Sequence, residues 1–113
     1  MSDDQPDVGF GSPNAWGYTL GTTSGQVLPS GVGQSRTGLI FHNPSATATI
    51  AVCPLTNSVT GEEQDAVING AGSYTILPLA ELRFVGLGYI NCAWSAVADT
   101  ASSPITILEF FSS

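Results

Sequence analysis

The chain has 113 residues, a length typical of one domain, and 42% of them are hydrophobic while only 10% are charged. Arg36 and Arg83 are its two basic residues against nine acidic ones, which gives a formal net charge of −7. This composition excludes a protein that binds nucleic acid or an anionic membrane by neutralising phosphates.

Residues 1–34 differ in composition from the rest of the chain. They are rich in Gly, Ser, Pro, Asp and Thr, and only residues 16–20 alternate as a short strand does. A segment of this kind buries too little apolar surface to fold alone. We therefore expect an extended N-terminal arm over residues 1–34 and a folded domain over residues 35–113. The beginning of the chain lacks the basic and apolar regions of a secretory signal, and no stretch is long and apolar enough to span a bilayer.

From residue 37 onward, short runs of branched and aromatic residues alternate with turn-forming residues. Asn69-Gly70 is a strong tight-turn signal, and Pro44 favours a hairpin turn. No window keeps helical periodicity over three turns. We predict an all-β fold, a single β-sandwich or jelly-roll-like barrel of seven to eight short strands. The expected strands span residues 37–43, 47–53, 73–77, 81–85, 89–97 and 105–111.

Successive side chains of a strand point to opposite faces, so sequence parity predicts which residues face the core. The predicted inward pairs are Leu39 with Phe41, Ile50 with Val52, Tyr74 with Ile76, Leu82 with Phe84, and Cys92 with Trp94.

Catalytic chemistry has little support in the sequence. His42 is the only histidine, and no GxSxG motif places a nucleophile for it, so we interpret it as a structural residue at a strand end. Glu81 shares a strand face with Arg83, and Glu109 can pair with Arg36 or Arg83. Acids paired with arginine are more often structural than catalytic. We expect no enzyme activity, although a small hydrolase built on His42 and the strand acids is a third possibility.

Metal and cofactor sites are not expected either. The acidic run at residues 62–65 lacks the spacing of a calcium loop, and no glycine-rich phosphate-binding motif follows a strand. Cys53 and Cys92 lie in apolar stretches without the spacing of a zinc site. They are more simply buried thiols, with a disulfide as the alternative.

Several apolar side chains lack obvious cover within the chain. Trp16 and Tyr18 lie in a segment with few apolar neighbours, and two consecutive Phe near the C-terminus point to opposite faces of a strand. We expect such residues to act as anchors, either on the rest of their own chain or on a partner subunit. The predicted interface residues are Phe10, Trp16, Tyr18, Leu20 and Phe111.

The pattern of strands and turns resembles the accessory virion proteins of tailed bacteriophages, such as capsid decoration proteins and head or tail fibre modules. The segments that carry the resemblance are residues 35–45 (SRTGLIFHNPS), 72–76 (GSYTI) and 103–110 (SPITILEF). The resemblance implies a non-enzymatic virion protein made in the host cytoplasm. It would bind a capsid or other virion protein, often as a homotrimer, with an arm extended over neighbouring subunits.

A carbohydrate-binding, lectin-like module of a phage fibre or spike is the alternative. Its aromatic platform would be Trp16 and Tyr18, or Tyr89, because exposed aromatic rings on a β-sandwich can stack on sugar rings.

Overall fold

The computed structural model describes residues 13–30, 36–56, 60–85 and 92–111. Of Pro13 it describes the backbone only. Within these residues the secondary structure consists of strands, with no helix long and apolar enough to cross a membrane. The strands are β1 (Pro13–Leu20), β2 (Gly25–Leu28), β3 (Arg36–His42), β4 (Ile50–Pro54), β5 (Tyr74–Ile76), β6 (Glu81–Val85), β7 (Trp94–Ala98) and β8 (Ser103–Phe111).

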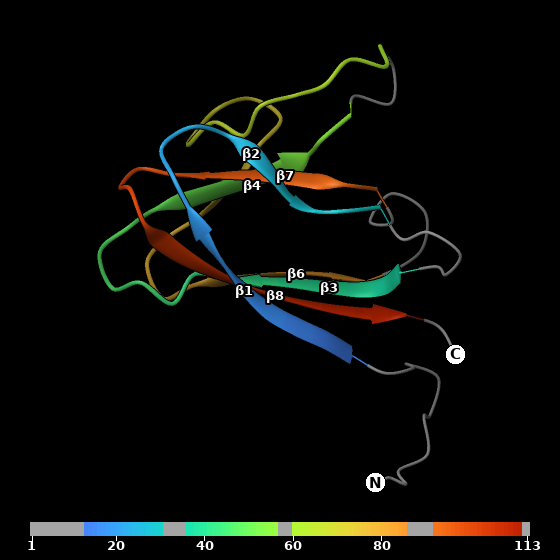
Figure 1. Cartoon of the computed structure of the whole chain (residues 1–113), viewed down its shortest axis with the longest axis horizontal. Coiled ribbons are helices and arrows are strands. Elements are labelled where there is room, and N and C mark those ends of the chain that lie inside the picture. Colours follow the sequence, from blue (N-terminus) through green and yellow to red (C-terminus); the bar gives the residue numbers. More distant parts are fainter. Residues whose placement is uncertain (1–12, 31–35, 57–59, 86–91, 112–113) are drawn as a thin grey trace, which may run out of the picture.

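The strands form two antiparallel sheets that lie one over the other (Figure 1). The first sheet has the order β1-β8-β3-β6, and the second has the order β2-β7-β4-β5. Consecutive strands alternate between the sheets, except for β4 and β5, which pair within the second sheet. This order of eight strands in two sheets is that of a jelly roll. The predicted β-sandwich is confirmed.

The core lies between the sheets and follows the predicted parity closely. Leu39, Phe41, Ile50, Val52 and Trp94 are fully buried there. At β5, a three-residue strand that pairs with β4 alone among the described strands, Ile76 is buried. Tyr74 also faces the core, with its ring 5.3 Å from that of Phe84 and 6.4 Å from that of Trp94. It is nevertheless exposed at 45%, because a short edge strand covers an aromatic ring on one side only.

Most predicted strands agree with the observed bounds to within one or two residues, and two of them differ by more. The strand expected from residue 47 begins at Ile50, because the Ser45 hydroxyl accepts hydrogen bonds from the Thr47 and Ala48 backbone amides and holds a turn. The strand expected over residues 89–97 is Trp94–Ala98, and residues 89–91 lie outside the described residues.

The predicted arm requires a correction over its described part. β1 pairs with β8 along its whole length, from Pro13 opposite Phe110 to Leu20 opposite Ser103, and β2 pairs with β7. Residues 13–28 are therefore part of the sandwich. They need not fold alone, because Leu20, Val27 and Leu28 are buried in a core to which both sheets contribute. Residues 1–12 and 31–34 of the predicted arm lie outside the described residues.

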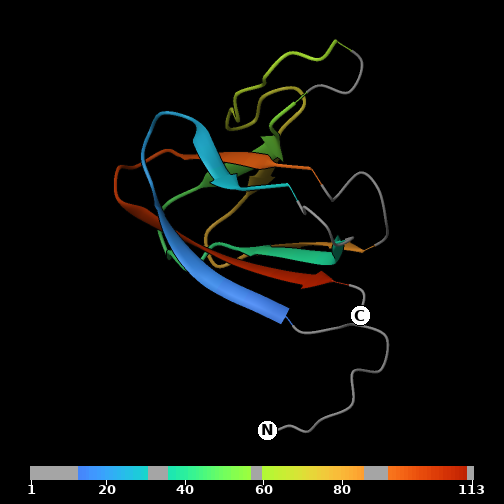
Figure 2. The ribbon, with the colours of Figure 1, turned by 45° about the vertical axis from the view of Figure 1, so that its right-hand side comes forward.

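The second sheet is covered on both of its faces. Ala51, Cys53 and Val97 point away from the main core and pack with Ala66 and Ile68 in a second, smaller cluster. Ala66 and Ile68 belong to the connection between β4 and β5, which lies beyond the second sheet, away from the first (Figures 1 and 2). This is why every residue of Trp94–Ala98 is buried.

Candidate protein-binding groove

The outer face of the first sheet has an apolar end and a polar end. Strand register aligns its outward residues in rows across the four strands. One row contains Pro13, Phe110, Gly38 and Val85, and the next contains Ala15, Leu108, Ile40 and Arg83. The third row is polar, with Gly17, Thr106, His42 and Glu81. The apolar rows lie where β3 begins and where β6 and β8 end.

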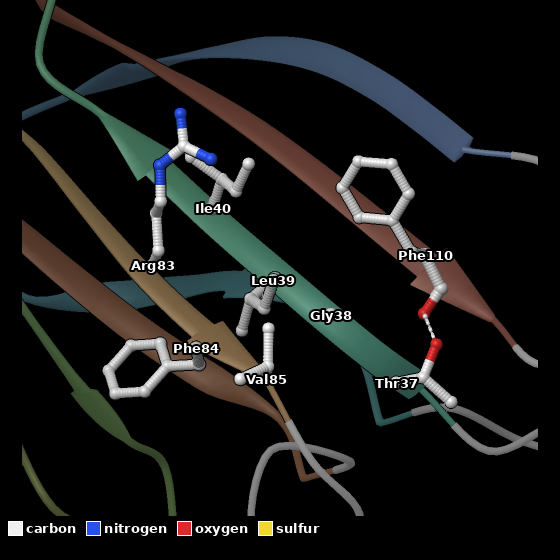
Figure 3. Close-up of a pocket in the computed structure, with 8 residues that line it drawn as sticks. All are labelled: Thr37, Gly38, Leu39, Ile40, Arg83, Phe84, Val85 and Phe110. Atoms are coloured by element: carbon white, nitrogen blue, oxygen red, sulfur yellow. Dashed lines mark hydrogen bonds between the residues drawn. The ribbon is translucent and has the colours of Figure 1, made fainter. Parts of the chain in front are cut away.

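A groove of about 430 Å³ lies over these apolar rows (Figure 3). That volume is within the range of small-molecule and side-chain binding pockets. Phe110 lines the groove from β8, and Val85 and Arg83 line it from β6. Thr37, Gly38, Leu39, Ile40 and Phe84 complete the lining. The groove is therefore a mainly apolar channel with a guanidinium at its edge.

Gly38 keeps the groove open. A Cβ atom at this position would lie 3.2 Å from Phe110 Cδ1, closer than ordinary van der Waals contact. The Thr37 hydroxyl donates a hydrogen bond of 3.3 Å to the Phe110 carbonyl oxygen, which holds β3 and β8 together at the same point (Figure 3). The absence of a side chain at Gly38 thus leaves room beside the Phe110 ring.

The apolar side chains of these two rows are not covered as those of the second sheet are. Val85 is exposed at 79%, and Ile40, Leu108 and Phe110 are half-buried. None of these four belongs to either buried core cluster of the described residues. Within the part of the chain that the structure describes, the β4–β5 connection covers the second sheet, whereas these apolar side chains of the first sheet stay exposed or half-buried.

The charged residues of the first sheet form two pairs. Arg83 pairs with Glu81 on the exposed outer face, as predicted. On the inner side Arg36 Nε lies 3.0 Å from Glu109 Oε2, and both side chains are buried. The Arg36 guanidinium also donates to the backbone carbonyls of Pro29 and Cys92. This buried pair is one of the two partnerships predicted for Glu109, and its role is structural.

The predicted interface residues do not gather at one place. Leu20 is exposed at only 3% and belongs to the main core, so it cannot be an interface residue of the folded chain. Trp16 is half-buried against that core, whereas Tyr18 is exposed at 46%. Phe111 is half-buried opposite Arg36, and Phe10 lies outside the described residues.

The groove residues Gly38, Ile40 and Val85 were not predicted. Parity had assigned Leu39 and Phe41 to the core, and the same parity places Gly38 and Ile40 on the opposite face. Two apolar residues and a glycine on the outward side of neighbouring strands were thus a usable signal. Strand order was needed to combine them, because β3, β6 and β8 are neighbours only in the folded sheet.

The aromatic residues expected of a lectin-like module lie beside only a small hollow. A hollow of about 60 Å³ lies beside Tyr18 and Leu20, well below the volume of a typical ligand pocket. Tyr89 lies outside the described residues. Sugar binding therefore stays a prediction.

His42 is the last residue of β3, as expected of a structural residue at a strand end, but its side chain has fewer hydrogen bonds than expected. Its Nδ1 atom is buried and has no hydrogen-bond partner among the described residues. In the same part of the chain, no group of three or more His, Cys, Asp or Glu side chains could hold a metal ion.

Both cysteines are thiols. Cys53 is buried in the smaller cluster, with its Sγ atom 3.3 Å from Ser95 Oγ. Cys92 is half-buried, and burial raises the pKa of its thiol, while its backbone hydrogen bond and the Arg36 charge act in the opposite direction.

Comparison with known proteins identifies similar folds but no family. No protein-family model and no curated protein matches the sequence. A solved structure reported with the statement that Bacillus endospore appendages form a novel family of disulfide-linked pili is similar over 99% of this chain and 97% of that one, with a TM-score of 0.55 and 8% identity. At this identity the likeness concerns the fold alone.

A second similar structure is dTDP-4-dehydrorhamnose 3,5-epimerase from Bacillus anthracis, with a TM-score of 0.48 and 12% identity. The alignment covers 92% of this chain but only 54% of the epimerase, so the chain spans about half of that enzyme's length.

Proposed function

We propose that this chain is a non-enzymatic structural subunit that associates with further copies of itself through the groove on the first sheet. The observation that carries the proposal is the unequal cover of the two sheets. The chain seals the outer face of the second sheet with its own β4–β5 connection, whereas Val85, Ile40 and Phe110 on the first sheet have no such cover among the described residues. Apolar patches of this kind mark contact sites between proteins.

The similar fold of a protein from disulfide-linked pili is consistent with a role in an assembly. The sequence resemblance to phage accessory proteins supports a more specific form of the proposal, in which the assembly is a virion and the chain decorates its capsid as a homotrimer. The strong negative charge favours an outer position, away from packaged nucleic acid.

The test is the mass of the full chain in solution, measured by light scattering over a range of micromolar concentrations. We expect a discrete oligomer, and Val85→Glu should reduce it to the monomer because a carboxylate would have to be desolvated in the groove. Leu77→Glu is the matched control, because Leu77 is an exposed apolar residue outside the groove. A wild-type chain that stays monomeric throughout would overturn the proposal.

The virion form needs a separate experiment. Particles purified from the source culture should contain the chain at a fixed ratio to the major shell protein, as measured by mass spectrometry. Its consistent absence from such particles would exclude the capsid role while leaving self-association intact.

A further inference from the structure

We propose that the groove of one copy binds the N-terminal segment of another copy, with Phe10 as the inserted side chain. The inference rests on the proposed self-association and names the contact that produces it. Its starting point is the row of the first sheet that contains Pro13, Phe110, Gly38 and Val85. The chain enters β1 in this row, so residues 1–12 join the sandwich at the apolar end of the first sheet, with β8 between their point of attachment and the rest of the groove.

The composition of that segment fits the groove. Val8 and Phe10 are its apolar residues after Met1, and they alternate with Gly9 and Gly11. In an extended segment Val8 and Phe10 point to the same side, while the glycines allow the backbone to lie close to the sheet. A groove of about 430 Å³, open above Gly38, has room for an aromatic side chain and an aliphatic one together.

The charges of the segment and of the groove support the same placement of Phe10. The segment carries Asp3, Asp4 and Asp7 and no basic side chain. Arg83, at the edge of the groove, is the exposed one of the two basic residues, because Arg36 is buried. Arg83 already pairs with Glu81, and with Phe10 in the groove Asp7, three residues earlier, would share that guanidinium with Glu81. An acidic segment would be repelled by most of the surface of a chain with net charge −7, but less so at this edge.

A second copy is a better source of the segment than the same chain. Only Gly11 and Ser12 separate Phe10 from Pro13. A residue before proline favours an extended conformation, which leaves Gly11 as the place for any reversal of the chain. The Phe110 ring also stands on β8, between β1 and the groove. Phe10 would have to reverse within one residue and pass over that ring to reach its own groove.

Insertion of a segment of one copy into a groove of the next is a heterologous contact. Such contacts close into rings, for example trimers, or continue as open filaments. Each copy donates one segment and accepts one. A copy with a defective segment and a copy with a defective groove can therefore still form one contact with each other.

The test uses the full chain with Phe10→Ser, with Val85→Glu, and with an equimolar mixture of the two variants. Circular dichroism checks that each variant is folded, which is expected because Val85 is exposed and Phe10 precedes β1. Each variant alone should be monomeric by light scattering, with a loss of affinity of at least tenfold, as for a buried aromatic anchor. The mixture should give a species of twice the monomer mass.

The other outcomes separate this inference from the proposed function. If Phe10→Ser associates as the wild type does while Val85→Glu is monomeric, the groove binds another part of the chain and the inference is wrong, but self-association stands. If both variants and their mixture stay monomeric while the wild type associates, exchange between copies is overturned. If Val85→Glu associates normally, both the groove interface and the inference fail. A monomeric wild type overturns both.

Discussion

Arg36 and Glu109 form a buried ion pair, 3.0 Å apart, that joins the beginning of β3 to the end of β8. The Arg36 guanidinium also donates to the carbonyl oxygens of Pro29 and Cys92, which lie in two different connections. One side chain thus holds four segments together below the groove. The sheet end that presents Phe110 and Gly38 is fixed from inside.

Removal of one partner of this pair should destabilise the fold strongly. We expect Arg36→Met or Glu109→Gln to lower the free energy of unfolding by about 3–5 kcal/mol, because each leaves a buried group without its partner. The double variant Arg36→Met/Glu109→Gln should lose less than the sum of the two single losses. Urea unfolding followed by tryptophan fluorescence measures all three.

Arg83→Met is the matched control for the buried pair. Arg83 and Glu81 are exposed, and exposed ion pairs contribute about 0–1 kcal/mol. Equal losses for Arg36→Met and Arg83→Met would contradict the structural role assigned to Arg36.

Leu79 is a site where a substitution should stabilise the protein. Its φ of 64° lies in the left-handed region, which costs a branched residue about 1–2 kcal/mol, and its side chain is exposed at 64%. We expect Leu79→Gly to raise the free energy of unfolding by up to about 1 kcal/mol, since relief of strain exceeds the entropic cost of glycine. Leu77→Gly, at a residue exposed at 62% without positive φ, should destabilise instead. Thermal unfolding compares the two, and a destabilising Leu79→Gly would contradict the argument.

Gly38→Ala should weaken self-association without unfolding the chain. The added Cβ atom would lie 3.2 Å from Phe110 Cδ1, so the Phe110 ring must shift into the groove or away from it. The half-buried ring can move, and we expect the free energy of unfolding to change by less than about 1 kcal/mol. Light scattering should show a raised dissociation constant. Gly25→Ala is the control, because a Cβ atom there meets nothing within 4 Å.

The two thiols should react in a fixed order with iodoacetamide. Native chain should be modified at Cys92 first, and slowly near neutral pH, because burial raises the pKa of this thiol and the thiolate is the reactive form. The modification rate of Cys92 should keep rising with pH above the range in which the rate of an ordinary cysteine has levelled off. Cys53 should react only after denaturation, since it is buried. Mass spectrometry of the modified peptides gives the order.

The same raised pKa has a consequence for stability. The folded state disfavours the Cys92 thiolate, so the protonated thiol contributes to the free energy of unfolding. This contribution is fully present below the pKa that Cys92 has in the unfolded chain, and it is lost as the pH rises through the higher pKa of the folded chain. Alkaline solution should therefore destabilise the wild type more than Cys92→Ser. Equal alkaline sensitivity of the two chains would contradict the assigned shift.

The sequence predicted which strand residues face the core better than it predicted the edge strands and the outer faces of the sheets. Parity placed Leu39 and Phe41 correctly because every second residue of a strand faces the core. The turn predicted from the Asn69-Gly70 dipeptide is also present. Asn69 has a φ of 59°, and the Gly70 amide donates a hydrogen bond to the Val67 carbonyl oxygen. These features depend on neighbouring residues along the chain.

Features that depend on distant segments were missed. β2 has few local strand signals, and its Val27 and Leu28 are buried only because β7 pairs with it. Asn43 was predicted only as the last residue of a strand, yet it is fully buried and its side-chain amide donates to the carbonyls of Ala48, Ile76 and Leu77. The groove required the order β8-β3-β6, which periodicity does not contain.

The register that places Pro13 opposite Phe110 limits how the protein can be labelled or fused. A tag or domain attached before Pro13 or after Phe111 would emerge at the apolar end of the first sheet and would hinder the approach of another copy to the groove. A fluorescent label or displayed peptide is better inserted near Asn69-Gly70, in the exposed connection beyond the second sheet. Experiments on assembly therefore need reporters carried by that connection rather than by either end.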